Sequence, residues 1–202
     1  MRVASEAITR DHREIEKYYD EVVSTTDKDH QTRYGNQFTW ELARHSIAEE
    51  LIVYPAFEKY LGQKGKDMAE SDRKEHHQVC VSSTVKLFLK TFQNMKAEDP
   101  NYVPQLKDLM SNLSHHIKDE ENDDLPSLEK VLSDPDNAGI SESLAKNFGR
   151  CKAFVPSRSH PSAGENPPFE SVMGLLTAPI DHLGDLFRKF PNEVISPNPS
   201  KK

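Results

Sequence analysis

The sequence has few of the residues that build disulfide frameworks or glycine-rich turns. It contains two cysteines and 8 glycines among 202 residues. Two cysteines are too few for a disulfide scaffold and define no zinc site, so we expect free thiols in a reducing compartment. The low glycine content, together with 35% hydrophobic and 29% charged residues, favours a helix-rich soluble protein over a β-sandwich or barrel.

Other absences exclude classes of partner. The chain has 26 basic and 33 acidic residues, a net charge of −7, and no lysine or arginine cluster of the kind that nucleic-acid binding needs. No apolar run reaches the roughly 18 residues of a membrane span, and the N-terminus lacks the apolar core of a secretory signal. We therefore expect no nucleic acid, no membrane and a cytoplasmic location. The sequence shows no nucleophilic triad or phosphate loop, which disfavours an enzyme without excluding one.

Helical periodicity dominates the first two thirds of the chain. Apolar and selected polar residues recur at steps of three and four over residues 5–24, 34–60 and in a segment after "EDPNYVP", while residues 66–97 are apolar nearly all round. In the first segment the stripe consists of Ile8, His12, Ile15, Tyr19 and Val22. Short connections between four helices predict an all-α, antiparallel up-down four-helix bundle over residues 1–133.

Composition changes near residue 134, and nine of the 13 prolines lie beyond it. We expect residues 134–202 to form a C-terminal extension packed on the bundle, with disordered last residues. Short helices are predicted in "SESLAKNFGRC" and in "PPFESVMGLLTAPIDHLGDLFRKFP". The second carries an apolar stripe that is predicted to pack on the bundle rather than on a membrane, made of Ile180, Leu183, Leu186 or Phe187, and Phe190.

The bundle contains an internal repeat of a two-helix unit. "DHREI" at 11–15 matches "EHHQV" at 75–79, and "RHSIAEELIVYP" at 44–55 matches "HHIKDEENDDLP" at 115–126. In the second pair each histidine is followed by glutamate four and five positions later and by proline ten positions later. The same register occurs in both halves, which favours a shared role over chance.

This repeat decides between neighbouring histidines. His76, not His77, corresponds to the histidine of the first segment, and His116, not His115, has the glutamate spacing and lies on the leucine stripe. Six polar side chains are then predicted to point into the bundle, namely His12, His45, Glu49, His76, His116 and Glu120. The structural alternative is a set of hydrogen-bonded helix pairs and satisfied core histidines.

Residues four apart lie on one face of a helix, so each His–Glu pair offers a nitrogen and a carboxylate to one point. A buried carboxylate without a cation is costly or becomes protonated, and metal ions supply the missing charge. Imidazole and carboxylate ligands suit iron, manganese or zinc better than calcium or magnesium. Distributed over four facing helices, the six residues resemble a two-metal site of a helical bundle, with coordination positions left for a small ligand.

In order and at bundle spacing, "DHREIE", "RHSIAEELIVYP", "EHHQV" and "HHIKDEENDDLP" resemble the hemerythrin-like, HHE cation-binding family over about residues 5–132. The resemblance implies a four-helix bundle with two iron ions bridged by an oxygen species and by carboxylates. This centre would be accessible to dioxygen or related small oxidants. Its implied iron ligands are the six residues named above, and manganese or zinc is the lesser alternative. The proline-rich extension is similar to those on hemerythrin-like proteins of filamentous fungi.

Two departures from oxygen-carrying hemerythrins stand against reversible oxygen transport. His76 is followed four positions later by Cys80 instead of a second histidine, and the last motif has Glu120 at four and Glu121 at five where those proteins have aspartate at five. We leave open whether Cys80, His77, His115 or Glu121 joins the metal shell. The hypotheses are a protein that binds or senses dioxygen, iron or small oxidants, a di-iron enzyme that decomposes peroxide or nitric oxide, and a scaffold with a vestigial site.

Overall fold

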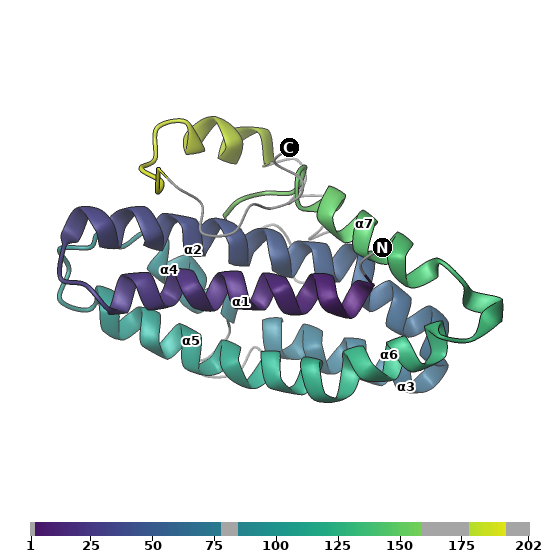
Figure 1. The fold of residues 1–202 in the computed structure, drawn as a ribbon. Coiled ribbons are helices and arrows are strands. Elements are labelled where there is room, and N and C mark those ends of the chain that lie inside the picture. The colour runs from purple at the N-terminus through teal and green to yellow at the C-terminus, as the bar shows by residue number, and fades with distance from the viewer. Residues whose placement is uncertain (1–2, 78–84, 159–177, 193–202) are drawn as a thin grey trace.

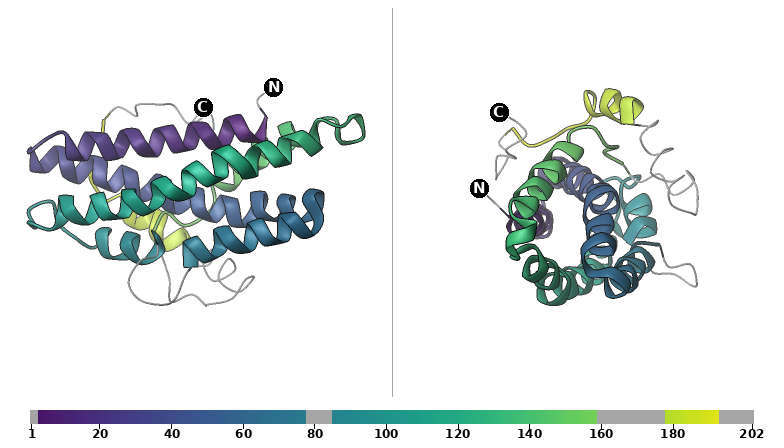
Figure 2. Two further views of the ribbon diagram at one scale, coloured as in Figure 1. Left: turned by 90° about the horizontal axis from the view of Figure 1, so that it is seen from below. Right: turned by 90° about the vertical axis from the view of Figure 1, so that its right-hand side faces the viewer.

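The computed structural model describes residues 3–77, 85–158 and 178–192, without the side chains of residues 74–88. Within these ranges the protein is an all-helical bundle, as predicted, with its long helices side by side (Figures 1 and 2). The elements are, in order, α1 (Ala4–Val23), α2 (Lys28–Ala48), η1 (Glu49–Val53), α3 (Tyr54–His77), α4 (Val85–Phe92), α5 (Tyr102–Asp119), η2 (Glu120–Asp124), α6 (Leu125–Leu132), η3 (Pro135–Asn137) and α7 (Ile140–Cys151). Of these, η1 and η2 are π-helical and η3 is a 3₁₀ turn.

Helix α2 begins at Lys28, earlier than the predicted residue 34, because Asp27 caps it. The Asp27 Oδ1 atom accepts hydrogen bonds from the backbone N–H groups of Asp29, at 2.9 Å, and His30, at 3.4 Å. An aspartate at this position satisfies amides that the first turn leaves without a helical partner. Part of the polar connection "TTDKDHQTRYG" is therefore helical.

The two halves of the repeat each contain a π-helical turn at the same place. The backbone N–H of Tyr54 donates to the carbonyl of Glu49, and that of Leu125 donates to the carbonyl of Glu120, five residues back in both cases. The next residue is the repeated proline, which lacks an N–H and cannot continue the α-helical pattern. Such single π turns occur often at functional sites. Each begins on a glutamate that the sequence predicted to be a metal ligand.

The second and third predicted helices meet at Gly62. Its φ of 60° and ψ of −129° lie outside the helical region, in a conformation that glycine adopts without a Cβ clash. This break divides α3, so that the predicted helix over residues 34–60 ends here. The predicted helix over residues 66–97 consists of the rest of α3 and of α4, and residues 78–84 between them lie outside the described part of the chain.

The buried apolar residues form two clusters along the bundle. One contains Ile15, Phe38, Leu42, Leu109 and Leu113, and the other contains Ile8, Ala48, Tyr54, Phe57 and Leu125. The first cluster also holds the fully buried Tyr18, whereas Tyr19, which the periodicity predicted, is only partly buried. On α1 the buried His12 lies between Ile8 and Ile15, and on α2 the buried His45 lies between Leu42 and Ala48, so polar residues separate the two clusters. The candidate site therefore lies between two apolar halves of the core.

Helix α7 packs against α1 and η1 (Figure 1). At its start, the Ser141 hydroxyl accepts a hydrogen bond from the backbone N–H of Ala4 and donates one to Glu129 Oε1, both at 2.8 Å. Toward its end, Phe148 is buried and lies edge-on to His45, with 5.8 Å between the ring centroids. These contacts hold α7 next to one of the predicted ligands.

A short helix over residues 178–185 is attached to the bundle through polar groups. Asp181 is buried, and Asp185 Oδ2 accepts a hydrogen bond of 2.5 Å from the Ser157 hydroxyl. Just beyond this helix, the Phe190 carbonyl accepts a bond of 2.9 Å from Arg33 Nη1. Hydrogen bonds and burial of charge therefore set the orientation of this segment.

The predicted packing of the apolar stripe in this segment is wrong for four of its residues. Ile180, Leu183, Leu186 and Phe187 are 71%, 60%, 77% and 86% exposed. Only Phe190 turns inward, edge-on to Trp40. The predicted disorder of the last residues falls on 193–202, outside the described chain. Within the described residues, no helix has the length and apolarity needed to cross a membrane.

Candidate metal centre

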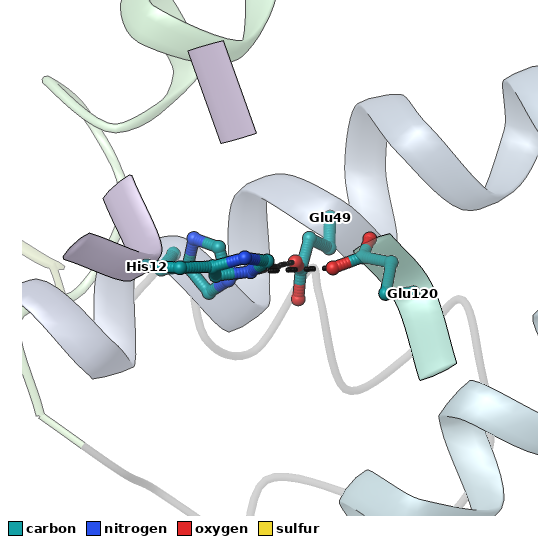
Figure 3. A group of neighbouring side chains, drawn as sticks. His12, Glu49 and Glu120 are labelled. Atoms are coloured by element: carbon teal, nitrogen blue, oxygen red, sulfur yellow. Dashed lines mark ion pairs between the residues drawn. The ribbon is translucent and has the colours of Figure 1, made fainter. Parts of the chain in front are cut away.

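Four of the six predicted site residues meet at one point inside the bundle. They are His12 on α1, His45 on α2, Glu49 on η1 and Glu120 on η2, and one ligand atom of each lies within 4.8 Å of all the others. Their exposed fractions are 0%, 1%, 0% and 0%. Figure 3 shows the His12 ring directed at the carboxylates of Glu49 and Glu120.

The contacts at this point pair each imidazole with a carboxylate. His45 Nε2 lies 2.7 Å from Glu49 Oε1, so the predicted pair four residues apart is in contact. His12 Nε2 lies 3.2 Å from Glu120 Oε2 and 4.0 Å from Glu49 Oε1. Two Nε2 atoms and two carboxylates thus converge from four elements, which is the donor set that a transition-metal ion takes in a helical bundle.

The two carboxylates favour the protonated form of both imidazoles. Burial alone would lower the pKa values of His12 and His45, but the neighbouring carboxylates outweigh it and raise both pKa values. Neither oxygen of Glu120 accepts a hydrogen bond of good geometry from a described residue. A buried carboxylate in this state is costly, so these residues fit a site for a cation.

A second layer of carboxylates holds the outer nitrogens of the two rings. His12 Nδ1 lies 2.7 Å from Glu121 Oε1, and His45 Nδ1 lies 3.3 Å from Asp11 Oδ2. A carboxylate on one ring nitrogen fixes the proton there and orients the other nitrogen toward a metal. Both Nε2 atoms therefore face the centre of the site.

These contacts give Glu121 a place distinct from that of Glu120. Glu121 binds the outer nitrogen of His12 and also pairs with Arg13. Although partial burial opposes them, His12 and then Arg13 lower the pKa of the Glu121 carboxyl group. Glu50, its counterpart in the first half of the repeat, accepts a hydrogen bond of 3.0 Å from Arg73 Nε. In this structure Glu121 supports a ring rather than replacing Glu120.

Of the two remaining predicted residues, only His116 has a described side chain, and it lies outside the group of four. His116 is 2% exposed on α5, whereas its neighbour His115 is exposed, as the repeat predicted. His76 and His77 lie in the last turn of α3 with side chains outside the described part, and Cys80 lies outside it altogether. The structure thus brings together four of the six residues and buries a fifth.

Sequence reasoning missed three ionisable residues around the site, of which Lys152 and Asp72 are buried and Asp11 is half-buried. Asp11 and Lys152 form an ion pair on the outer side of His45. Asp72 lies on α3 and interacts electrostatically with His116. Burial, then repulsion from neighbouring carboxylates, raises the pKa of Asp72 to about 8 despite the opposing effect of His116. Asp11 precedes a predicted ligand, and Asp72 precedes His76 by four residues. Nothing in the sequence around Lys152 marks it.

Comparisons with known proteins agree with this geometry. A sequence model described as the hemerythrin HHE cation binding domain matches residues 3–128, which include all four converging donors. The chain is also similar to an uncharacterized hemerythrin-like protein of Schizosaccharomyces pombe (strain 972), with 51% identity over 191 residues that cover 95% of this chain and 89% of the relative. This similarity to a fungal protein extends beyond the bundle into the C-terminal region. No solved structure gives a significant match.

Proposed function

Because this chain belongs to the hemerythrin family of HHE cation-binding proteins, we propose that it is a non-haem iron protein. In this proposal it holds two iron ions and binds or senses dioxygen, iron or a related small oxidant. The observation that carries the proposal is the convergence of four buried donors from α1, α2, η1 and η2 within 4.8 Å. Nitrogen and carboxylate donors of this kind suit iron.

The residues divide into those that would hold the metal and those that would orient them. His12, His45, Glu49 and Glu120 would form the nucleus of the centre, with both carboxylates near His12 and therefore in reach of a shared position. His116, buried four residues before Glu120, and His76 would complete it. Glu121 and Asp11 would keep the outer ring nitrogens protonated. Bound iron would supply a redox-active Lewis acid with positions left for a further ligand.

The burial of the site favours a ligand of a few atoms. The four converging residues are at most 1% exposed, and apolar clusters lie on both sides of them along the bundle. A large organic substrate needs a cleft that covers most of its surface, whereas a diatomic molecule or peroxide does not. Binding or sensing of such a molecule is therefore the function that the geometry supports best.

Sensing follows from the coupling between metal binding and folding. Metal that binds the folded chain stabilises it by mass action, and the buried carboxylates lose their repulsion when a cation is present. We therefore expect the melting temperature to rise when ferrous iron is added anaerobically to metal-free protein. An unchanged melting temperature at saturating iron would remove the support for sensing through stability.

Absorption spectra of the iron-loaded protein separate the three hypotheses. A binding protein should give a stable spectral change with dioxygen or azide and lose colour with excess peroxide. Sustained peroxide consumption without loss of iron would identify an enzyme and contradict the proposal. Protein that takes up no iron under anaerobic conditions would have a vestigial site.

A further inference from the structure

Lys152 is a buried cation outside the matched family domain, which ends at residue 128. It directly follows α7 and is 2% exposed. Lysine rarely loses this much solvent unless acidic groups compensate for its charge. The Lys152 ammonium contacts Asp11 Oδ2 and lies 3.1 Å from Glu41 Oε2. The partners come from α1 and α2, so one side chain of the C-terminal region joins two helices of the bundle.

The same Asp11 oxygen serves His45. Asp11 Oδ2 contacts Lys152 and lies 3.3 Å from His45 Nδ1, while His45 Nε2 lies 2.7 Å from Glu49 Oε1. A continuous chain of polar contacts therefore runs from the ammonium group, through one carboxylate and one imidazole, to a proposed iron ligand.

The backbone around Lys152 is held as firmly as its side chain. Its carbonyl accepts a hydrogen bond of 2.5 Å from Arg44 Nε, and its N–H donates to the carbonyl of Phe148. Arg44 is itself buried and lies over the Trp40 ring, 3.5 Å from the centroid. Phe148 packs edge-on to His45. The position of the ammonium is thus fixed relative to α2, which carries both Arg44 and His45.

We propose that Lys152 is a positioning residue for the metal centre, which holds Asp11 against His45 and thereby directs His45 Nε2 at the metal. This inference rests on the proposed function. The bundle therefore reaches its full metal affinity only when the segment after α7 is packed against it. The interaction is an ion pair rather than a titrating switch, since Lys152 and Asp11 remain oppositely charged over the physiological range. Burial alone would weaken both charges, but Glu41 and then Asp11 raise the pKa of Lys152, and Lys152 and then His45 lower that of Asp11 to about 2.

The test uses the full chain and Co²⁺ as a spectroscopic probe, with Fe²⁺ added anaerobically in parallel. Lys152→Met keeps most of the volume of the side chain and removes the charge. We expect metal affinity to fall, at most by the roughly 10–100-fold that follows loss of the outer hydrogen-bonding partner of a ligand, and the Co²⁺ ligand-field spectrum to shift. Lys146→Met is the matched control, because Lys146 is an exposed lysine on α7. It should retain wild-type affinity and spectrum.

A double variant tests the route through Asp11. If Lys152 acts through this carboxylate, Asp11→Asn combined with Lys152→Met should bind Co²⁺ no more weakly than Asp11→Asn alone. Lys152→Gln, which keeps a hydrogen-bond donor, serves the same comparison if the methionine variant does not fold. Lys152→Arg, which keeps the charge, should recover part of the lost affinity.

The outcomes separate this inference from the proposed function. If the wild-type protein binds neither metal, both are overturned. If it binds metal and the neutral Lys152 variants bind equally tightly with an unchanged spectrum, the positioning role alone is overturned. The positioning role is also overturned if these variants lose thermal stability but keep the wild-type metal affinity and spectrum.

Discussion

Nδ1 of His12 lies 2.7 Å from Oε1 of Glu121, although the two residues are 109 positions apart in the chain. The other nitrogen of the same ring faces Glu120, the preceding residue, so two consecutive glutamates take opposite sides of one imidazole. Both glutamates lie at the start of the π-helical η2, where the backbone hydrogen bond joins residues five positions apart instead of four. The ring is thereby oriented from outside while its inner nitrogen faces the candidate metal position.

This relationship predicts that Glu121→Gln weakens metal binding without unfolding the bundle. The amide keeps the shape of the side chain but removes the charge that orients the ring and favours its outer proton. We expect metal affinity to fall roughly 10–100-fold in equilibrium titrations with Fe²⁺. Glu16→Gln is the control, because Glu16 pairs with the same Arg13, whereas the nitrogens of the His12 ring pair with Glu120 and Glu121. Equal affinities in the two variants would contradict the role of Glu121.

Metal uptake should release protons from the centre. His12 and His45 have pKa values raised above 6.5 by carboxylates that outweigh their burial, which favours a proton on each Nε2. A metal ion has to displace these protons, so its affinity should fall roughly tenfold per unit decrease in pH for each proton displaced. Calorimetric titration in buffers of different protonation enthalpy counts the released protons. A buffer-independent heat would contradict this expectation.

The metal-free protein should lose stability as pH rises. The pKa of Asp72 is about 8 in the folded chain, mainly through burial, against 3.8 for an ordinary aspartate. Between these values the unfolded chain has released the proton that the folded chain retains, so the free energy of unfolding decreases with pH. The raised pKa values of the two histidines act in the same direction above about pH 6.5, because their stabilisation is lost as pH rises through the folded values.

Asp72→Asn tests this at a single position. The amide cannot ionise, so the variant should be more stable than wild type by about 1–3 kcal/mol at pH 8 and should show a flatter pH dependence in urea unfolding. Asp67→Asn is the control, because Asp67 is exposed on the same helix. It should change stability by no more than about 0.5 kcal/mol. A wild-type pH dependence in the Asp72 variant would contradict the assignment.

The same substitution at two leucines tests the exposed stripe of the C-terminal segment. Leu109 is 0% exposed and Leu186 is 77% exposed. Leu109→Ala should lower the free energy of unfolding by about 2–5 kcal/mol, since it leaves a cavity in the core. Leu186→Ala should stay within about 0.5 kcal/mol of wild type in the same denaturant titration. A large loss at Leu186 would mean that this side chain is buried in solution.

Periodicity and the internal repeat were enough to predict the helical bundle and the meeting of His12, His45, Glu49 and Glu120, because these depend on local spacing. The repeated proline was also visible, but the π turn before it depends on which carbonyl each N–H reaches. Likewise, the orientation of Leu186 is set by hydrogen bonds between distant segments. Lys152 has no local signal, because its partners Asp11 and Glu41 come close only in the folded chain.

The central claim is that the buried histidines and glutamates bind iron, and counting metal in two neighbouring variants tests it most directly. After anaerobic reconstitution with ferrous iron and desalting, the wild-type protein should retain about two iron ions per chain, the number that such bundle sites hold. His116→Ala should lower this sharply, whereas His115→Ala, at the exposed neighbour, should not. Wild-type protein without iron, or equal iron in the two variants, would contradict the account.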